Sequence, residues 1–221
     1  MQPIEIAIRA RIEHAAIQKD QELAGFIALV MDLEPLKTIV EVGAFAGGTL
    51  WAWKQMCDAR IIGVDMPPPG FPNGPQVNDL GMTVICGDSH DPATRDQLLT
   101  ELAGSPIDML FIDGDHTYEG VKADYELYSP LVRPGGIIGF HDIVNHPQQP
   151  YIVVQRFWLT LHGDKEEIIH SPEFGEWGGI GVLRAEDPDT VVANRAEQLE
   201  RYLKAQSGAY HVPGKTFQKV G

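Results

Sequence analysis

The chain has 221 residues, 43% of them hydrophobic and 22% charged, which suits one α/β domain with a sizeable core and small additions. Its net charge of −14 repels phosphate backbones and argues against a nucleic-acid substrate. No apolar run approaches the roughly 18 residues that span a bilayer, and the two cysteines form no CxxC pair, so we expect a cytoplasmic protein without a membrane segment.

The predicted elements alternate between strands and helices. In chain order they are a helix over 4–31, strand 37–42, helix 49–57, strands 60–65 and 82–86, helix 91–103, strand 107–113, helix 118–131, strand 137–142, helix 153–161, strands 166–170 and 179–184, and helix 188–204. This alternation predicts a parallel sheet covered on both faces, with the two late strands as an antiparallel pair at its edge. We divide the chain into an N-terminal helical extension (1–35), a central domain (36–186) and a C-terminal helix and tail (187–221).

Acidic residues recur at the ends of the first three strands. The first strand runs into Glu41-Val-Gly43-Ala44-Phe-Ala-Gly47-Gly48, the second ends in Asp65, and the third is followed by Asp88 and Ser89. In a doubly wound sheet these ends gather at one edge, where ligands bind. The glycines let the backbone approach a ligand, and the carboxylate of Asp65 can accept both hydroxyl hydrogens of a ribose. Asp88, aided by Ser89, suits an adenine amino group.

The glycine spacing separates two kinds of nucleotide cofactor. A dinucleotide site needs GxGxxG to hold a pyrophosphate, whereas this turn reads GxxxGG and follows Glu41. S-adenosylmethionine (SAM) has no pyrophosphate and ends in an amino acid whose ammonium suits an acid. We therefore expect SAM contacts from Glu41, Gly43, Ala44, Gly47, Asp65, Asp88, Ser89 and Asp113. An NAD(P)-type oxidoreductase and a non-catalytic SAM-binding protein stay open as alternatives.

Two further turns concentrate acids and histidines. The fourth strand ends in Asp113-Gly114-Asp115-His116 and the fifth in His141-Asp142, on neighbouring strands of such a sheet. Crowded carboxylates need compensation, so we predict a divalent cation, Mg²⁺ or Mn²⁺, held by Asp113, His141 and Asp142. Zn²⁺ stays open because His141 is available, although no cysteine pair or HxxxH spacing favours a closed zinc site. The cation would lower the pKa of an acceptor hydroxyl, and Asp115 or His116 would take its proton. The alternative is that the acids cap a helix and the histidines are buried structural residues.

These motifs carry a family resemblance. The segment FIDGDHTYEGV (111–121), then Asp124, LVRPGG (131–136) and His141-Asp142 resemble bacterial class I SAM-dependent methyltransferases, nearest to the macrocin and mycinamicin O-methyltransferases and cephalosporin-hydroxylase-type proteins. The resemblance covers about residues 36–184. It implies a Rossmann-like, doubly wound seven-stranded α/β sheet whose last strand is antiparallel, with helices on both faces. In metal-dependent members an acidic pair ends the fifth strand, whereas here the pair is His141-Asp142.

The acceptor is expected to be a small molecule bearing a hydroxyl group, such as a sugar, a phenol or a natural-product intermediate. Its site should involve the N-terminal helix, the loop 67–78 and the segment 145–158, with an aromatic wall drawn from Phe71, Tyr151, Phe157, Trp158 and Trp177. The apolar N-terminal helix suggests a homodimer.

Overall fold

The computed structural model describes residues 1–33, 35–66, 81–170 and 177–187. The chain divides into two compact units, Met1–Ala185 and Glu186–Gly221, and every element described below belongs to the first. The predicted loop 67–78, with Phe71, and the predicted helix 188–204 lie outside the described residues. The three-part domain division stays a prediction. Within the described ranges, no helix is both long and apolar enough to cross a membrane.

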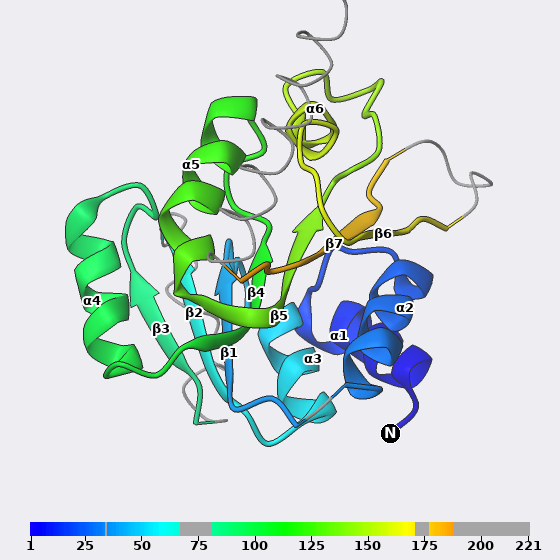
Figure 1. The fold of residues 1–221 in the computed structure, drawn as a ribbon. Coiled ribbons are helices and arrows are strands. Elements are labelled where there is room, and N and C mark those ends of the chain that lie inside the picture. The colour runs from blue at the N-terminus through cyan, green and yellow to red at the C-terminus, as the bar shows by residue number, and fades with distance from the viewer. Residues whose placement is uncertain (34, 67–80, 171–176, 188–221) are drawn as a thin grey trace, which may run out of the picture. The chain divides into compact units, whose positions relative to one another are not determined.

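The strands form one seven-stranded sheet in the order β3-β2-β1-β4-β5-β7-β6 (Figure 1). Their bounds are β1 (Thr38–Val42), β2 (Arg60–Asp65), β3 (Thr83–Cys86), β4 (Ile107–Ile112), β5 (Val132–His141), β6 (Lys165–Ile168) and β7 (Ile180–Arg184). The pairs from β3 to β5 are parallel, and β7 runs antiparallel to both β5 and β6. The predicted doubly wound sheet with an antiparallel last strand is therefore confirmed.

Helices cover both faces of this sheet. They are α1 (Pro3–His14), α2 (Asp20–Met31), α3 (Gly48–Met56), α4 (Pro92–Leu102), α5 (Tyr118–Tyr128), the short 3₁₀ turn Ser129–Leu131 and α6 (Val154–Trp158). Successive strand residues point to opposite faces, so Ile39 packs in a cluster with Phe26 and Trp53, whereas Val40 packs with Tyr128 and Trp158. Helices α1–α3 thus cover one face and α4–α6 the other.

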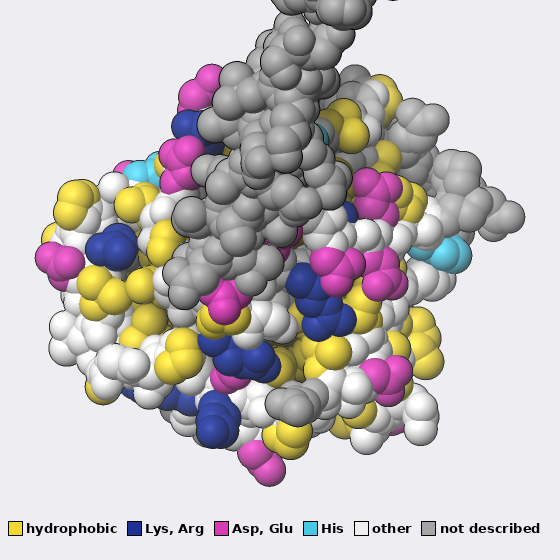
Figure 2. All heavy atoms as spheres, viewed as in Figure 1, with side chains coloured by type: hydrophobic (Ala, Val, Ile, Leu, Met, Phe, Trp, Pro, Cys, Tyr) yellow, Lys and Arg dark blue, Asp and Glu magenta, His cyan; other side chains and the backbone are white. Residues whose placement is uncertain are grey.

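The surface mixes charged and apolar side chains. On the face drawn in Figure 2, acidic and basic groups are interspersed with apolar ones rather than separated into fields of one sign. Among the described side chains of this face, no single acidic patch is visible.

The single helix predicted over 4–31 is wrong, because the segment forms two helices. α1 ends at His14, α2 begins at Asp20, and Ala15 between them has a φ of 60°. The connection passes against the start of α3, where a Cβ on Gly48 would lie 2.3 Å from the Ala16 nitrogen. This break turns the chain across the carboxyl edge of the sheet and brings Gln18 to the end of β4.

Smaller differences affect the ends of other elements. β5 begins at Val132, five residues before its predicted start, and includes the Pro134-Gly135-Gly136 segment that precedes the predicted strand. The register between β4 and β5 shifts there, which accommodates the two glycines within the strand. The predicted start of α4 is confirmed, since Asp91 accepts a hydrogen bond from the Ala93 nitrogen.

Candidate active site

A cavity of about 1040 Å³ lies at the carboxyl ends of the parallel strands. Residues that follow each of the strands β1–β5 line it, together with the α1–α2 connection and the segment 146–152. Ligand pockets of proteins span about 300–1,000 Å³, so the volume suits a nucleoside cofactor together with a second molecule. The described lining contains five aspartates and four histidines but neither lysine nor arginine.

Most of the predicted site residues meet in this cavity. Its lining includes Gly43, Ala44, Asp65, Asp88, Ser89, Asp113, Asp115, His116, His141 and Asp142. Glu41 and Gly47 do not line it. The acids at the ends of β2, β3 and β4 therefore converge instead of scattering over the surface, while the individual roles of these residues stay predictions.

The glycine turn after β1 approaches the turn after β4 very closely. Gly43 has a φ of 90°, and a Cβ there would lie 2.1 Å from the Asp113 carbonyl oxygen. Only glycine fits such a position. The next loop residue, Phe45, donates its backbone N–H to Asp65 Oδ2. Burial raises the pKa of Asp65 above its ordinary value, although this backbone N–H partly offsets that effect. Asp65 is thus fixed at the rim of the cavity.

Glu41 lies behind this turn rather than in the cavity. It is fully buried, and its two carboxylate oxygens accept hydrogen bonds from Thr49 Oγ1 and Trp53 Nε1 of α3. Burial raises the pKa of Glu41 to about 8, against the lowering effect of these two bonds. The side chain ties β1 to α3, so any influence on a ligand acts through the position of the turn.

Asp88 belongs to a second linked group at the β3 end of the cavity. Its Oδ1 accepts the backbone N–H of His90 at 2.9 Å, and His90 Nε2 lies 3.2 Å from Asp124 Oδ1. Asp124 on α5 is fully buried, and burial raises its pKa to about 6. His90 thus connects the loop that carries Asp88 to the helix that follows β4.

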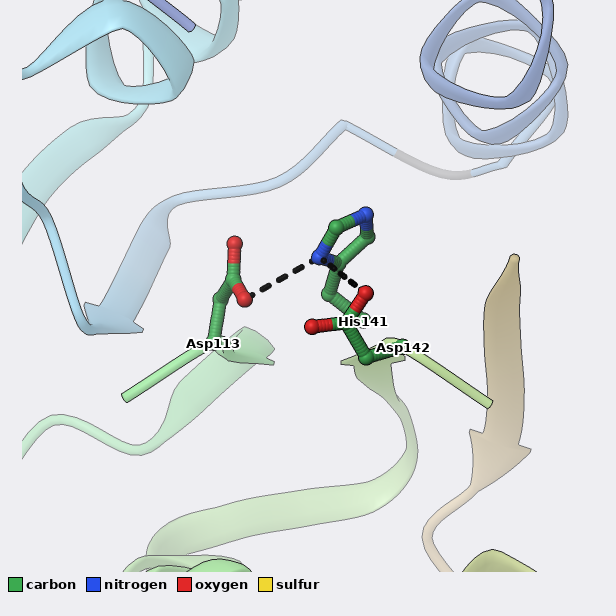
Figure 3. A group of neighbouring side chains, drawn as sticks. All are labelled: Asp113, His141 and Asp142. Atoms are coloured by element: carbon green, nitrogen blue, oxygen red, sulfur yellow. Dashed lines mark hydrogen bonds and ion pairs between the residues drawn. The ribbon is translucent and has the colours of Figure 1, made fainter. Parts of the chain in front are cut away.

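Asp113, His141 and Asp142 come together from the ends of β4 and β5 (Figure 3). His141 Nδ1 lies 3.1 Å from Asp113 Oδ1 and 3.4 Å from Asp142 Oδ1. Burial lowers the pKa of His141, but the nearby carboxylates outweigh it and raise this pKa to about 9. A positive charge is therefore favoured between the two aspartates. Burial raises the pKa of Asp142, but His116, His141 and His146 outweigh it and lower this pKa to about 2.

Asp142 also contacts two further imidazoles. His116 Nδ1 lies 2.9 Å from Asp142 Oδ2, and His146 Nε2 lies 2.9 Å from Asp142 Oδ1. Burial lowers the pKa of His116, but the bond to Asp142 and the charge of Asp113 raise it above its ordinary value. Asp142 has a φ of 63°, a left-handed conformation that aspartate tolerates.

Asp115 has a different setting from its neighbour His116. Its Oδ1 accepts the backbone N–H of Thr117 at 2.8 Å, and Thr117 in turn caps α5 by accepting the N–H of Gly120. A Cβ on Gly120 would lie 2.1 Å from the Asp115 carboxylate carbon, so this carboxylate lies against the first turn of α5. The turn before α5 thus engages the carboxylate of Asp115, whereas the imidazole of His116 contacts Asp142.

The sequence does not single out Gln18 or His90, and it indicates His146 only as part of the segment 145–158, yet all three line the cavity. Gln18 donates from Nε2 to Asp113 Oδ2 at 2.5 Å, across 95 residues of sequence. The acids of the first turn of α2, Asp20 and Glu22, mark a helix start and are the local signal for the break before them. His90 and His146 carry no such signal, since isolated histidines are most often structural.

The comparisons with known proteins agree with this geometry. Residues 40–143 match the family described as a methyltransferase domain. A demethylmacrocin O-methyltransferase of Streptomyces fradiae is 31% identical over 102 residues, which are 45% of this chain and 24% of that protein. The first three curated relatives are covered over 56%, 24% and 9% of their length, so the chain spans about half of them or less.

Two solved structures share the fold. The O-methyltransferase TomG of Streptomyces achromogenes, in complex with SAM, is 19% identical with a TM-score of 0.56, over 84% of this chain and 90% of that one. The MycE methyltransferase of mycinamycin biosynthesis, in complex with Mg, SAH and mycinamycin VI, is also 19% identical, with a TM-score of 0.57 over 85% and 56% of the two chains. Residues 40–143, which match the methyltransferase domain family, hold the glycine turn, His116 and Asp142.

Proposed function

We propose that this chain is a SAM-dependent methyltransferase that transfers a methyl group to a hydroxyl oxygen of a small molecule. The observation that carries the proposal is a single cavity with two chemically distinct ends. One end holds the glycine turn with Asp65, and the other holds the His116–Asp142 pair. The matched family and the O-methyltransferase names of the relatives support this assignment.

The β2–β3 end suits the nucleoside of SAM. Asp65 offers carboxylate oxygens to the ribose hydroxyls, and Asp88 with Ser89 offers acceptors to the adenine amino group. Gly43 and Ala44 leave the backbone between them open to close approach. The predicted Glu41 and Gly47 contacts become indirect in this proposal, because these residues shape the turn from outside the cavity.

The β4–β5 end suits the transfer step. When bound, SAM supplies an electrophilic methyl group on a sulfonium. His116 turns Nδ1 toward Asp142, which fixes the tautomer whose Nε2 accepts the proton of the acceptor hydroxyl. Asp142 then stabilises the imidazolium that forms. Holding the reactants side by side contributes on the order of 7–11 kcal/mol to lowering such barriers.

The trio Asp113, His141 and Asp142 fits a divalent cation. Its atoms lie within 4.8 Å of one another, and the site already favours a positive charge at His141. When bound, such a cation would lower the pKa of the acceptor hydroxyl and so assist proton transfer to His116. The solved complex of MycE with Mg supports a role for a cation in this type of fold.

The lining of the cavity favours an uncharged acceptor. The described lining carries five aspartates and no lysine or arginine, so a phosphate or carboxylate group would meet repulsion. Tyr151 and Trp177 line the cavity, whereas Phe157 and Trp158 are buried in the apolar core and do not. A neutral sugar or phenol stacked on Tyr151 and Trp177 fits this surface. The homodimer and the cytoplasmic location stay predictions.

The deciding experiment is calorimetric titration of the protein with SAM and with NAD⁺, each with Mg²⁺ and with a chelator. We expect SAM to bind and NAD⁺ not to bind. NAD⁺ binding without SAM binding would refute the methyltransferase in favour of the oxidoreductase. If SAM binds but no hydroxylated acceptor is methylated across a panel of neutral sugars and phenols, the result would support a non-catalytic SAM-binding protein.

A further inference from the structure

We propose that His141 makes the trio at the β4 and β5 ends selective for a first-row transition dication, with Mn²⁺ preferred over Mg²⁺. The inference rests on the proposed function, because it concerns the cation that would activate the acceptor. It goes further in assigning one side chain, the imidazole of His141, as the residue that sets the identity of that cation.

The spacing of the donor atoms matches neighbouring positions of an octahedral cation. Bonds of about 2.1 Å at right angles place adjacent ligand atoms about 3 Å apart. His141 Nδ1 lies 3.1 Å from Asp113 Oδ1 and 3.4 Å from Asp142 Oδ1. Figure 3 shows this nitrogen turned toward both carboxylates, with Asp113 on one side and Asp142 on the other. The His141 nitrogen is therefore placed as a third ligand atom beside the two carboxylate oxygens.

The chemical composition of the set decides which cation it prefers. Mg²⁺ favours all-oxygen surroundings and keeps several waters, whereas an imidazole nitrogen suits first-row transition metals. Two carboxylate oxygens with one imidazole nitrogen remain acceptable to Mn²⁺, the transition dication that carboxylates and water also suit. Exchanging an oxygen donor for this nitrogen should therefore shift the balance from Mg²⁺ toward Mn²⁺.

A second observation points independently to a ligand at this place. Gln18 lines the cavity, is only 4% exposed, and holds Asp113 Oδ2 with its Nε2 at 2.5 Å. Its Oε1 is buried and has no hydrogen-bond partner within the described structure. A buried amide oxygen without a partner is costly, so it calls for a donor or a cation. Gln18 thus orients one acid of the trio and offers a further hard oxygen beside it.

The competing interpretation is an ion pair without a metal. A protonated His141 between the two aspartates would satisfy their charges, and the trio would then serve structure alone. The two interpretations differ in what the site binds, so a binding measurement separates them without an assay of methyl transfer.

The test is calorimetric titration of chelator-treated full-length protein with Mn²⁺ and with Mg²⁺, for wild type, His141→Asp and His162→Asp. His162→Asp makes the same change at an exposed position outside the cavity and controls for added negative charge. We expect wild type and the control to bind Mn²⁺ at least about tenfold more tightly than Mg²⁺. In His141→Asp this ratio should fall about tenfold, because the nitrogen donor becomes an oxygen. Thermal unfolding establishes that each variant is folded.

A second readout needs no variant. Electron spin-echo spectra of Mn²⁺ bound to the wild type should contain modulation from a directly coordinated nitrogen. Absence of this modulation, an equal Mn²⁺/Mg²⁺ ratio in wild type and His141→Asp, or no cation binding would each overturn the inference. Failure of SAM to bind while the cation results hold would instead count against the methyltransferase and leave the assignment of His141 standing.

Discussion

At the scale of single residues, Asp65 and Asp142 divide the proposed chemistry between the two ends of one cavity. Asp65 stands at the end of β2 and is held by the Phe45 N–H, whereas Asp142 follows β5 and contacts three imidazoles. One carboxylate is placed to bind a cofactor and the other to orient a base. Their substitutions should therefore have separable effects.

Asp65→Ala should weaken SAM binding about 10- to 100-fold, since hydrogen bonds to a charged group contribute about 1.5–3 kcal/mol. Asp142→Ala should leave SAM affinity nearly unchanged and reduce the rate of methyl transfer by about 10²–10⁴, the usual contribution of a positioned base. Calorimetry and a methyl-transfer assay measure the two effects. Asp96→Ala, on the exposed side of α4, is the control. Equal SAM affinity in wild type and Asp65→Ala would contradict the ribose role.

Glu41 gives a prediction about stability and pH. Its pKa is about 8 in the folded protein, above its value in an unfolded chain, so the folded state binds more protons between about pH 4.5 and 8. The free energy of unfolding should therefore fall as pH rises through this window, by at most about 1.4 kcal/mol per pH unit from this group. The stabilisation that Glu41 contributes is fully present below the pKa that Glu41 has in the unfolded chain.

Glu41→Gln should remove that slope while keeping the contacts, because its amide oxygen can accept from Trp53 and its amide nitrogen can donate to Thr49. Urea unfolding of both proteins between pH 5 and 8 measures the difference. The variant should gain stability relative to wild type as pH rises. A constant difference across this range would show that Glu41 does not titrate there.

At the scale of elements, the connection between α1 and α2 contributes to the site, although the sequence predicts no loop there. It carries Gln18 to Asp113 and adds residues 15–18 to the cavity lining. The apolar spacing predicts helical structure in both segments but gives no sign of the break between them. The reason for the break is tertiary: α3 begins so close to Ala16 that a straight helix would not fit.

Gly48→Ala tests this packing, because the close approach decides whether the change raises or lowers the free energy of unfolding. Inside a helix this change normally stabilises by up to about 1 kcal/mol. Here the new Cβ would lie 2.3 Å from the Ala16 nitrogen and 2.7 Å from the His14 carbonyl oxygen, both backbone atoms that cannot swing away. We therefore expect a loss of about 1–3 kcal/mol in the free energy of unfolding, the usual cost of overpacking. Denaturant titration measures it, and a gain in stability would refute the close approach.

At the scale of the whole molecule, the sequence predicts the architecture better than it predicts the site. The strand ends at Asp65, Asp88 and Asp113 follow from local signals, and sheet topology then brings them to one edge. By contrast, the position of Glu41 outside the cavity depends on how α3 packs on β1. The spacing of residues in the sequence does not predict that packing. The entry of Gln18 and His146 likewise depends on contacts between segments distant in sequence, here 95 residues apart for Gln18 and Asp113.

The same packing makes a prediction about truncation. α1 and α2 supply Leu23, Phe26 and Ile27 to the apolar cluster on one face of the sheet, and burial of each side chain contributes about 1.5–3 kcal/mol. A domain is stable by only about 5–15 kcal/mol, so a chain that starts at residue 36 should show no cooperative unfolding transition in calorimetry. A chain that ends at Asp187 retains the unit Met1–Ala185 with both clusters, so it should unfold cooperatively near the wild-type temperature. Cooperative unfolding of the chain from residue 36 would instead support a separable N-terminal extension.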